Sequence, residues 1–161
     1  MDKRVIHSVF ENIVSEYPNS IALSHSKGEV TYTLLNKKAN RIADLLMKRG
    51  LIKGDVVSVF FEDRLQQLEV VIGTFKSGGI YLPLDSKYRE KHWGVLFENI
   101  QPKFIVLSED KKADFEALNS KFEYTIPELI IYSNENENIR TYSIKEGAYV
   151  PNDPLEFLSE N

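Results

Sequence analysis

The chain has 161 residues, of which 42% are hydrophobic and 27% charged, with a formal net charge of −4 and no cysteine. These proportions are those of a soluble globular protein, and they exclude a disordered chain, a disulfide scaffold, a thiolate metal site and a cysteine nucleophile. Without a basic tract, an apolar run of ~20 residues or a secretory signal at the N-terminus, we expect a cytoplasmic protein with no nucleic-acid and no membrane partner.

The first thirty residues predict a helix followed by a strand pair. Apolar side chains recur at helical spacing over residues 6–17, and Pro18 ends that helix because the residue before a proline disfavours the helical conformation. Residues 21–24 and 29–33 read as two short strands around a turn that contains Gly28. The sequence therefore predicts a small hairpin near the N-terminus.

A longer amphipathic helix is expected next, over residues 34–49. Thr33 stands where an N-cap is needed, and Gly50 is placed to end the helix as a C-terminal cap. The residues predicted to face the core are Leu35, Ala39, Ile42, Ala43 and Leu46.

The remaining pattern alternates strands with helices. Residues 56–61 form a nearly continuous β-branched and aromatic run, which is typical of a parallel strand covered on both faces. Asp63 is placed to cap a helix over residues 64–76, with an inward face made by Leu65, Leu68, Ile72 and Phe75. The later elements are a strand at 80–82, a helix at 90–99, a strand at 104–107, a helix at 112–121 and a strand at 129–132.

In the helix at 90–99, the spacing predicts an inward face of His92, Val95, Leu96 and Ile100. Strands that alternate with helices predict right-handed crossovers, so we expect an α/β fold with a doubly wound, mostly parallel sheet and helices on both faces. We assign residues 1–133 to this α/β unit and 134–161 to a weakly structured continuation, with a polar loop at 134–138, a strand-like alternation at 139–144 and a tail without clear structure from Pro151.

Few residues suggest chemistry by themselves. The glycines at 78–79 follow a helix, whereas a phosphate loop has its glycines before a helix N-terminus, so we interpret them as a C-cap and turn. His7, His25 and His92 show no metal-ligand spacing. Asp85 follows a strand, where parallel sheets place functional groups, but a turn or cap residue explains it as well. Trp93 suits core packing or an interface.

Two motifs and their surroundings change this interpretation. The segments VTYTLLN at 30–36 and ANRIA at 39–43, followed by TFKSGGIYLPLD at 74–85, resemble the first two core motifs of amino-acid adenylation domains of nonribosomal peptide synthetases. Weaker likenesses stand in the same order around them: VFE at 9–11, PNSIAL at 18–23, GLIKGDVV at 50–57 and FENIQPK at 97–103. The chain departs from the family at Leu34, where a Glu is usual, and at 86–92, where the family's prolines and arginine are displaced or lost.

The resemblance implies the N-terminal scaffold of an adenylate-forming enzyme. The complete enzyme activates an amino acid with Mg·ATP to an aminoacyl-adenylate, and passes it to the phosphopantetheine thiol of a carrier protein. In the family, the ATP, amino-acid and lysine sites lie C-terminal to the matched region. We therefore expect no catalytic, cofactor-binding or metal-binding residue in this chain, and no activity from it alone.

Two alternatives stay open: a free-standing truncated interaction module, and the N-terminal part of an acyl-CoA or aryl-acid ligase. The partners implied are the remainder of the adenylation domain and a carrier protein. We also expect self-association through an apolar face that includes Trp93, Phe97, Tyr142 and Tyr149.

Overall fold

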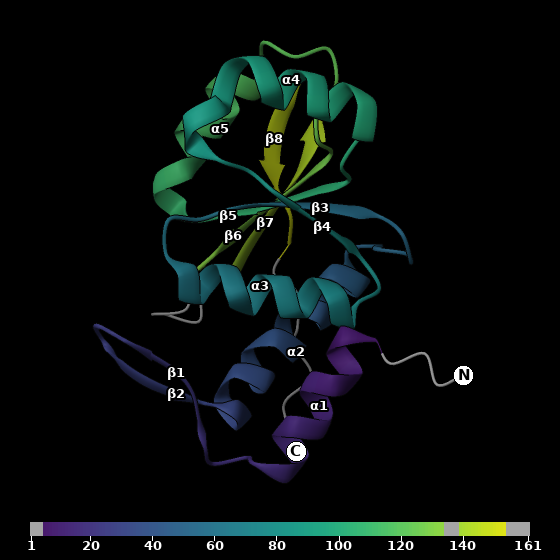
Figure 1. Cartoon of the computed structure of the whole chain (residues 1–161). Coiled ribbons are helices and arrows are strands. Elements are labelled where there is room, and N and C mark those ends of the chain that lie inside the picture. Colours follow the sequence, from purple (N-terminus) through teal and green to yellow (C-terminus); the bar gives the residue numbers. More distant parts are fainter. Residues whose placement is uncertain (1–4, 134–138, 154–161) are drawn as a thin grey trace.

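The computed structural model describes residues 5–133 and 139–153, with residues 88–91 described as backbone only. Figure 1 shows a sheet with helices on both faces and a separate hairpin below it. In chain order the elements are α1 (Ile6–Glu16), β1 (Ile21–His25), β2 (Gly28–Thr31), α2 (Tyr32–Lys48), β3 (Val56–Phe60), α3 (Arg64–Lys76), β4 (Ile80–Pro83), η1 (Ser86–Tyr88), α4 (Arg89–Ile100), β5 (Phe104–Leu107), η2 (Glu109–Lys111), α5 (Lys112–Asn119), β6 (Glu128–Tyr132), β7 (Ile139–Lys145) and β8 (Ala148–Pro151).

The main sheet has six strands in the order β4-β3-β5-β6-β7-β8. The first four are parallel to one another, and the last two join antiparallel. Helices α2 and α3 cover one face, whereas α4 and α5 cover the other (Figure 1). The predicted α/β fold, with a doubly wound, mostly parallel sheet and an N-terminal strand pair, is confirmed.

Alternate side chains of the central strands enter two different hydrophobic cores. In β3, Val57 and Val59 pack under α2 and α3, whereas Phe60 packs under α4 and α5. β5 alternates in the same way, with Val106 in the first core and Leu107 in the second. Because both faces are buried, the strands need no polar side, which explains their nearly continuous apolar sequences.

Of the two predicted N-caps, one is confirmed and the other lies two residues earlier than expected. Asp63 Oδ1 accepts hydrogen bonds from the backbone N–H groups of Leu65 (2.8 Å) and Gln66 (3.1 Å), so the predicted cap of α3 is confirmed. The cap of α2 is Thr31 and not Thr33, because the helix begins two residues earlier than expected. The Thr33 hydroxyl instead donates to the carbonyl of Pro18 at 2.7 Å, which ties α2 to the end of α1.

Two helices bury a different face from the predicted one. In α4, Trp93 and Phe97 enter the core, while Val95 and Ile100 remain 59% and 39% exposed. The two aromatic rings lie four residues apart and bury more apolar area than the aliphatic stripe that was predicted. In α3 the predicted face Leu65, Leu68, Ile72 and Phe75 is only partly buried, and the fully buried positions are Glu69, Val70, Gly73 and Thr74.

The C-terminal part adds strands that we did not all predict. The alternation at 139–144 forms β7 as expected, but β8 at 148–151 was missed, and both belong to the main sheet. The described part of 134–161 is therefore structured, although we expected a weakly structured continuation. The predicted loop at 134–138 and the tail from residue 154 lie outside the described residues.

The residues proposed to form an exposed apolar face were wrongly chosen. Trp93 is 1% exposed, and Phe97 is buried beside it in the core under α4 and α5. Tyr142 and Tyr149 are partly buried and pack against that same core. Their aromatic rings stabilise this layer instead of facing a partner.

Candidate functional site

The two sequence motifs meet where α2 packs on α3. A Cβ atom at Gly73 would lie 2.8 Å from the Cβ of Ile42 and 2.9 Å from the carbonyl oxygen of Ala39. Both neighbours belong to the first motif, and Gly73 directly precedes the second. The close approach of these helices therefore depends on glycine, and it fixes the layer that covers one face of the sheet.

The glycine pair of the second motif ends α3, as the sequence indicated. Gly78 has a φ of 83°, a left-handed conformation that favours glycine, and the Gly79 N–H donates to the Thr74 carbonyl at 2.9 Å. The carbonyl end of a helix carries partial negative charge and disfavours an anion. The C-cap interpretation is confirmed, and this turn lacks the geometry of a phosphate loop.

The carboxyl ends of β3 and β5 meet where the crossover direction of the sheet changes, which is the usual ligand position of such folds. An ion pair occupies this position: Lys111 after β5 contacts the carboxylate of Glu62 after β3. The Lys111 ammonium also lies 5.6 Å from the ring centroid of Phe60, and the residue is only 7% exposed. The Lys111 ammonium also lies 3.7 Å from the Asp110 carboxylate, so one buried cation at this edge of the sheet faces two exposed carboxylates.

The other candidate residues have local structural partners. Asp85 Oδ1 accepts from the backbone N–H of Lys87 at 2.8 Å, which is the turn role that we considered for it. His25 Nδ1 accepts from the backbone N–H of Lys27 at 3.2 Å. Within residues 5–133 and 139–153, no group of three or more His, Asp or Glu side chains is placed to hold a metal ion. None of the helices in that part of the chain has the length and apolar character that a bilayer crossing requires.

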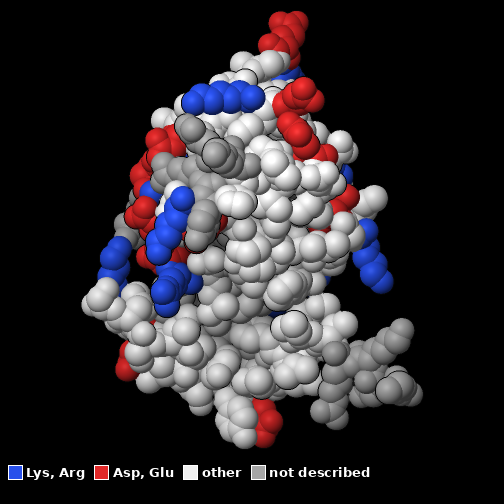
Figure 2. Space-filling view, turned by 45° about the horizontal axis from the view of Figure 1, so that its top comes forward, with Lys and Arg blue, Asp and Glu red and all other residues white. Residues whose placement is uncertain are grey.

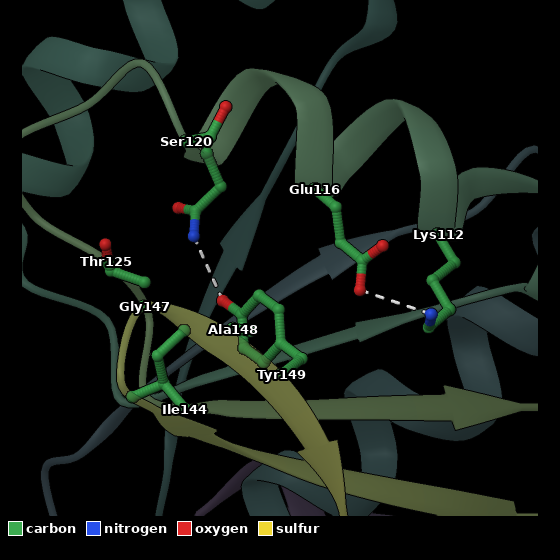
Figure 3. A pocket seen from close by; sticks show the side chains of 9 residues that line it. Lys112, Glu116, Ser120, Thr125, Ile144, Gly147, Ala148 and Tyr149 are labelled. Carbon is green, nitrogen blue, oxygen red and sulfur yellow. Dashed lines mark hydrogen bonds and ion pairs between the residues drawn. The ribbon is translucent and has the colours of Figure 1, made fainter.

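A cavity of about 460 Å³ lies between α5 and the β7–β8 hairpin. Figure 3 shows the charged side chains of Lys112 and Glu116 on the helix and the ring of Tyr149 on the hairpin. The residues that line it are Lys112, Glu116, Asn119, Ser120, Thr125, Ile144, Gly147, Ala148 and Tyr149.

Hydrogen bonds hold the floor of this cavity. The side-chain amide of Asn119 donates to the Tyr149 hydroxyl at 3.0 Å, and that hydroxyl donates to the carbonyl of Ile126 at 2.6 Å. Burial, and secondarily the nearby carboxylate of Glu116, raises the pKa of Tyr149 above its ordinary value. The Asn119 Oδ1 atom is buried and has no hydrogen-bond partner among the described residues, a condition that costs about 1–3 kcal/mol in proteins.

Sequence reasoning missed this cavity. It requires the hairpin to fold against α5, and β8 was not predicted. The only available signal was the spacing of Lys112, Glu116 and Asn119, which places all three on one face of a helix.

The chain is similar to known enzymes over most of its length. The family model of the AMP-binding enzyme matches residues 10–156. A plipastatin synthase polypeptide of Bacillus subtilis is 31% identical over 134 residues, which cover 83% of this chain and 5% of that protein. Gramicidin S synthase 1 of Brevibacillus brevis is 28% identical over 64% of this chain and 9% of its own length.

Solved structures share the fold. The ATP-bound MatB of Rhodopseudomonas palustris has a TM-score of 0.63 and 25% identity, over 78% of this chain and 25% of MatB. The fused adenylation–PCP di-domain NpsA-ThdA of Klebsiella oxytoca has a TM-score of 0.62 and 17% identity, over 87% of this chain and 29% of that structure.

The described residues thus form a two-faced α/β scaffold of the kind found in adenylate-forming enzymes. The chain belongs to the family of AMP-binding enzymes. It spans a small part of the curated relatives that it matches, about a twentieth to a tenth of the peptide synthetases named above.

Proposed function

We propose that this chain is the N-terminal scaffold of an amino-acid adenylation domain in a nonribosomal peptide synthetase. In its complete form, such a domain activates an amino acid with ATP and transfers the aminoacyl group to a carrier protein. The observation that supports this proposal most directly is the meeting of the two motifs at the α2–α3 contact, within a region matched by the AMP-binding family model. The relatives named above are peptide synthetases, which favours this branch over the acyl-CoA or aryl-acid ligases.

In this proposal, the residues of this chain hold the sheet and its helices in place and take no direct part in the reaction. Gly73 sets the distance between α2 and α3, and Gly78 turns the chain from α3 into β4. The Lys111–Glu62 ion pair links the segments that follow β5 and β3. Together they would hold the sheet as a rigid support for groups supplied by the rest of the domain.

ATP, Mg²⁺ and a carrier-protein phosphopantetheine are the groups that the complete enzyme would use. We propose that the residues that bind them lie outside this chain, a proposal supported by the glycine pair, which stands at the carbonyl end of a helix instead of an N-terminus. We therefore assign none of these groups to a residue of this chain. We also propose a cytoplasmic location, which the cysteine-free composition fits.

The proposal is tested by amino-acid-dependent ATP–pyrophosphate exchange. A purified polypeptide of these 161 residues should give no exchange above background with any amino acid. A chimera in which residues 10–156 replace the matching region of the plipastatin synthase polypeptide should retain exchange and the amino-acid preference of the recipient. Robust exchange by the 161 residues alone, or a folded chimera whose amino-acid preference has changed, would contradict a pure scaffold role.

Self-association remains a further proposal, now on a different surface. Val95 and Ile100 of α4 are apolar side chains that remain 59% and 39% exposed. Figure 2, in which the top of the molecule comes forward, shows an area without Lys, Arg, Asp or Glu near the middle of the view, with charged residues toward the edges. Exposed aliphatic side chains of this kind favour contact with another surface, such as that of the remainder of the domain or, in this chain by itself, that of a second copy.

A further inference from the structure

Helix α1 has little structural support of its own. None of its residues is fully buried, and the apolar side chains of Phe10, Ile13 and Val14 are only partly buried. Its N-cap residue Val5 makes no side-chain cap bond, the first turn has no acidic residue and the last turn has no basic one. An uncapped helix of 11 residues is marginal in water, so α1 depends on the surface to which it docks.

A buried cation joins α1 to the C-terminal end of α3. The Lys76 ammonium lies 2.5 Å from the Glu11 carboxylate and 5.8 Å from the ring centroid of Phe10. The Lys76 side chain is 5% exposed, whereas the Glu11 side chain is 51% exposed. The two partners are therefore unequal. Removal of the Glu11 charge would leave a buried ammonium without this carboxylate, whereas removal of the Lys76 charge would leave a carboxylate that water already solvates.

The segment that follows α1 is anchored separately. The backbone N–H and the hydroxyl of Thr33 donate to the carbonyl of Pro18 at 3.0 and 2.7 Å, and the Tyr32 N–H donates to the carbonyl of Ser20 at 3.1 Å. These hydrogen bonds involve no residue of α1, so they can persist when α1 leaves its place. Movement of the helix is thereby confined to the residues before Pro18.

We propose that α1 is a strap that opens and closes on α3 while the rest of the chain stays folded, with the Lys76–Glu11 pair as its latch. In the closed state, Phe10 and Glu11 contribute to the cover of Lys76, the last residue of α3 and part of the second sequence motif. In the open state α1 unfolds and the Lys76 ammonium gains access to water. The strap thus controls the exposure of a cation next to the Gly78 turn, and it is independent of the proposed scaffold function.

Amide hydrogen exchange of the 161-residue chain, followed residue by residue with NMR, tests this proposal. In the wild type, the amides of α1 should exchange at least about tenfold faster than those of α2, because α1 opens without global unfolding. Glu11→Gln should speed exchange in α1 by at least about a further tenfold, because opening releases the buried Lys76 ammonium into water. The amides of α2 should keep their wild-type exchange rates in this variant.

Lys76→Met separates the latch from simple packing. Methionine retains an apolar side chain beside Phe10 and removes the charge, so Lys76→Met should keep α1 exchange within about threefold of the wild type, alone and combined with Glu11→Gln. Asp44→Asn is the matched control, since it alters the Asp44–Lys48 pair within α2 and should leave α1 exchange unchanged.

Three results would overturn the proposal. The first is a wild-type α1 that exchanges no faster than α2. The second is a Glu11→Gln variant that leaves α1 exchange unchanged or speeds α1 and α2 alike. The third is a double variant, Glu11→Gln with Lys76→Met, whose α1 exchanges as fast as that of Glu11→Gln alone.

Discussion

Gly73→Ala is the sharpest perturbation of the α2–α3 contact. The added methyl group would lie 2.8 Å from both the Cβ and the Cγ2 of Ile42, and 2.9 Å from the backbone oxygen of Ala39. Such distances are well below the ~3.5–4.0 Å of a normal contact, and neither neighbour is the far end of a flexible side chain. The helices must therefore separate by several tenths of an ångström.

The size of the effect follows from two opposing terms. Overpacking costs ~3 kcal/mol at the upper end of its usual range, because both obstacles are rigid. Replacing glycine by alanine inside a helix returns ~1 kcal/mol. We expect a net loss of ~2 kcal/mol in the free energy of unfolding, which lowers the Tm of a chain of this length by ~4–8 °C.

Urea unfolding can follow this change through the fluorescence of Trp93, which is the one tryptophan of the sequence and is 1% exposed. Gly94→Ala is the matched control in α4, since the nearest atoms to its methyl group would belong to the ring of Phe122, at 3.0 Å. That ring can rotate at a cost of ~0.5–1.5 kcal/mol, so this variant should stay within ~1 kcal/mol of the wild type. A Gly73→Ala protein as stable as the wild type would refute the tight α2–α3 contact.

Three further outcomes are expected. Asp63→Ala should lower the free energy of unfolding by ~1 kcal/mol because two N–H groups of α3 lose their acceptor, whereas Asp63→Asn should retain most of it in the same urea assay. Burial raises the pKa of Tyr149 in the folded chain, so as the pH rises the unfolded chain loses this proton first, near pH 10. Above that pH the free energy of unfolding should fall by up to ~1.4 kcal/mol per pH unit. Tyr149→Phe should remove the contribution of this residue to the fall. Sedimentation at several concentrations should show self-association that Val95→Glu abolishes, and a strictly monomeric wild-type chain would contradict the exposed-face proposal.

The order of helices and strands was predictable because each strand of the parallel part is an apolar run and most of the helices between them have recognisable ends. Val56–Phe60 and Phe104–Leu107 could be assigned almost to the residue for that reason. Helix orientation was less predictable. Trp93 and Phe97 compete with an aliphatic stripe on the same helix, and only the shape of the sheet decides which face enters the core.

The hydrophobic pattern of the sequence also could not predict which polar residues are buried. Glu69 is fully buried in α3, where the Tyr132 hydroxyl donates to its carboxylate. Hydrophobic periodicity counts a glutamate as exposed, so the predicted face of α3 was shifted away from the true one. The cavity was missed for a related reason, because it depends on Asn119 and Tyr149, which are 30 residues apart and meet only in the folded chain.

The strand order has a consequence for biosynthesis. β3 is made first of the six strands, yet it lies between β4 and β5, and β5 is completed about 50 residues after β3. At 5–20 residues per second, a ribosome needs ~2–10 s for that interval. During this time one edge of β3 has no neighbour to pair with, while α2 and α3 are already available to cover one of its faces. The nascent chain therefore passes through a stage with an open apolar strand, at which a chaperone such as a ribosome-associated holdase would have its strongest effect on yield.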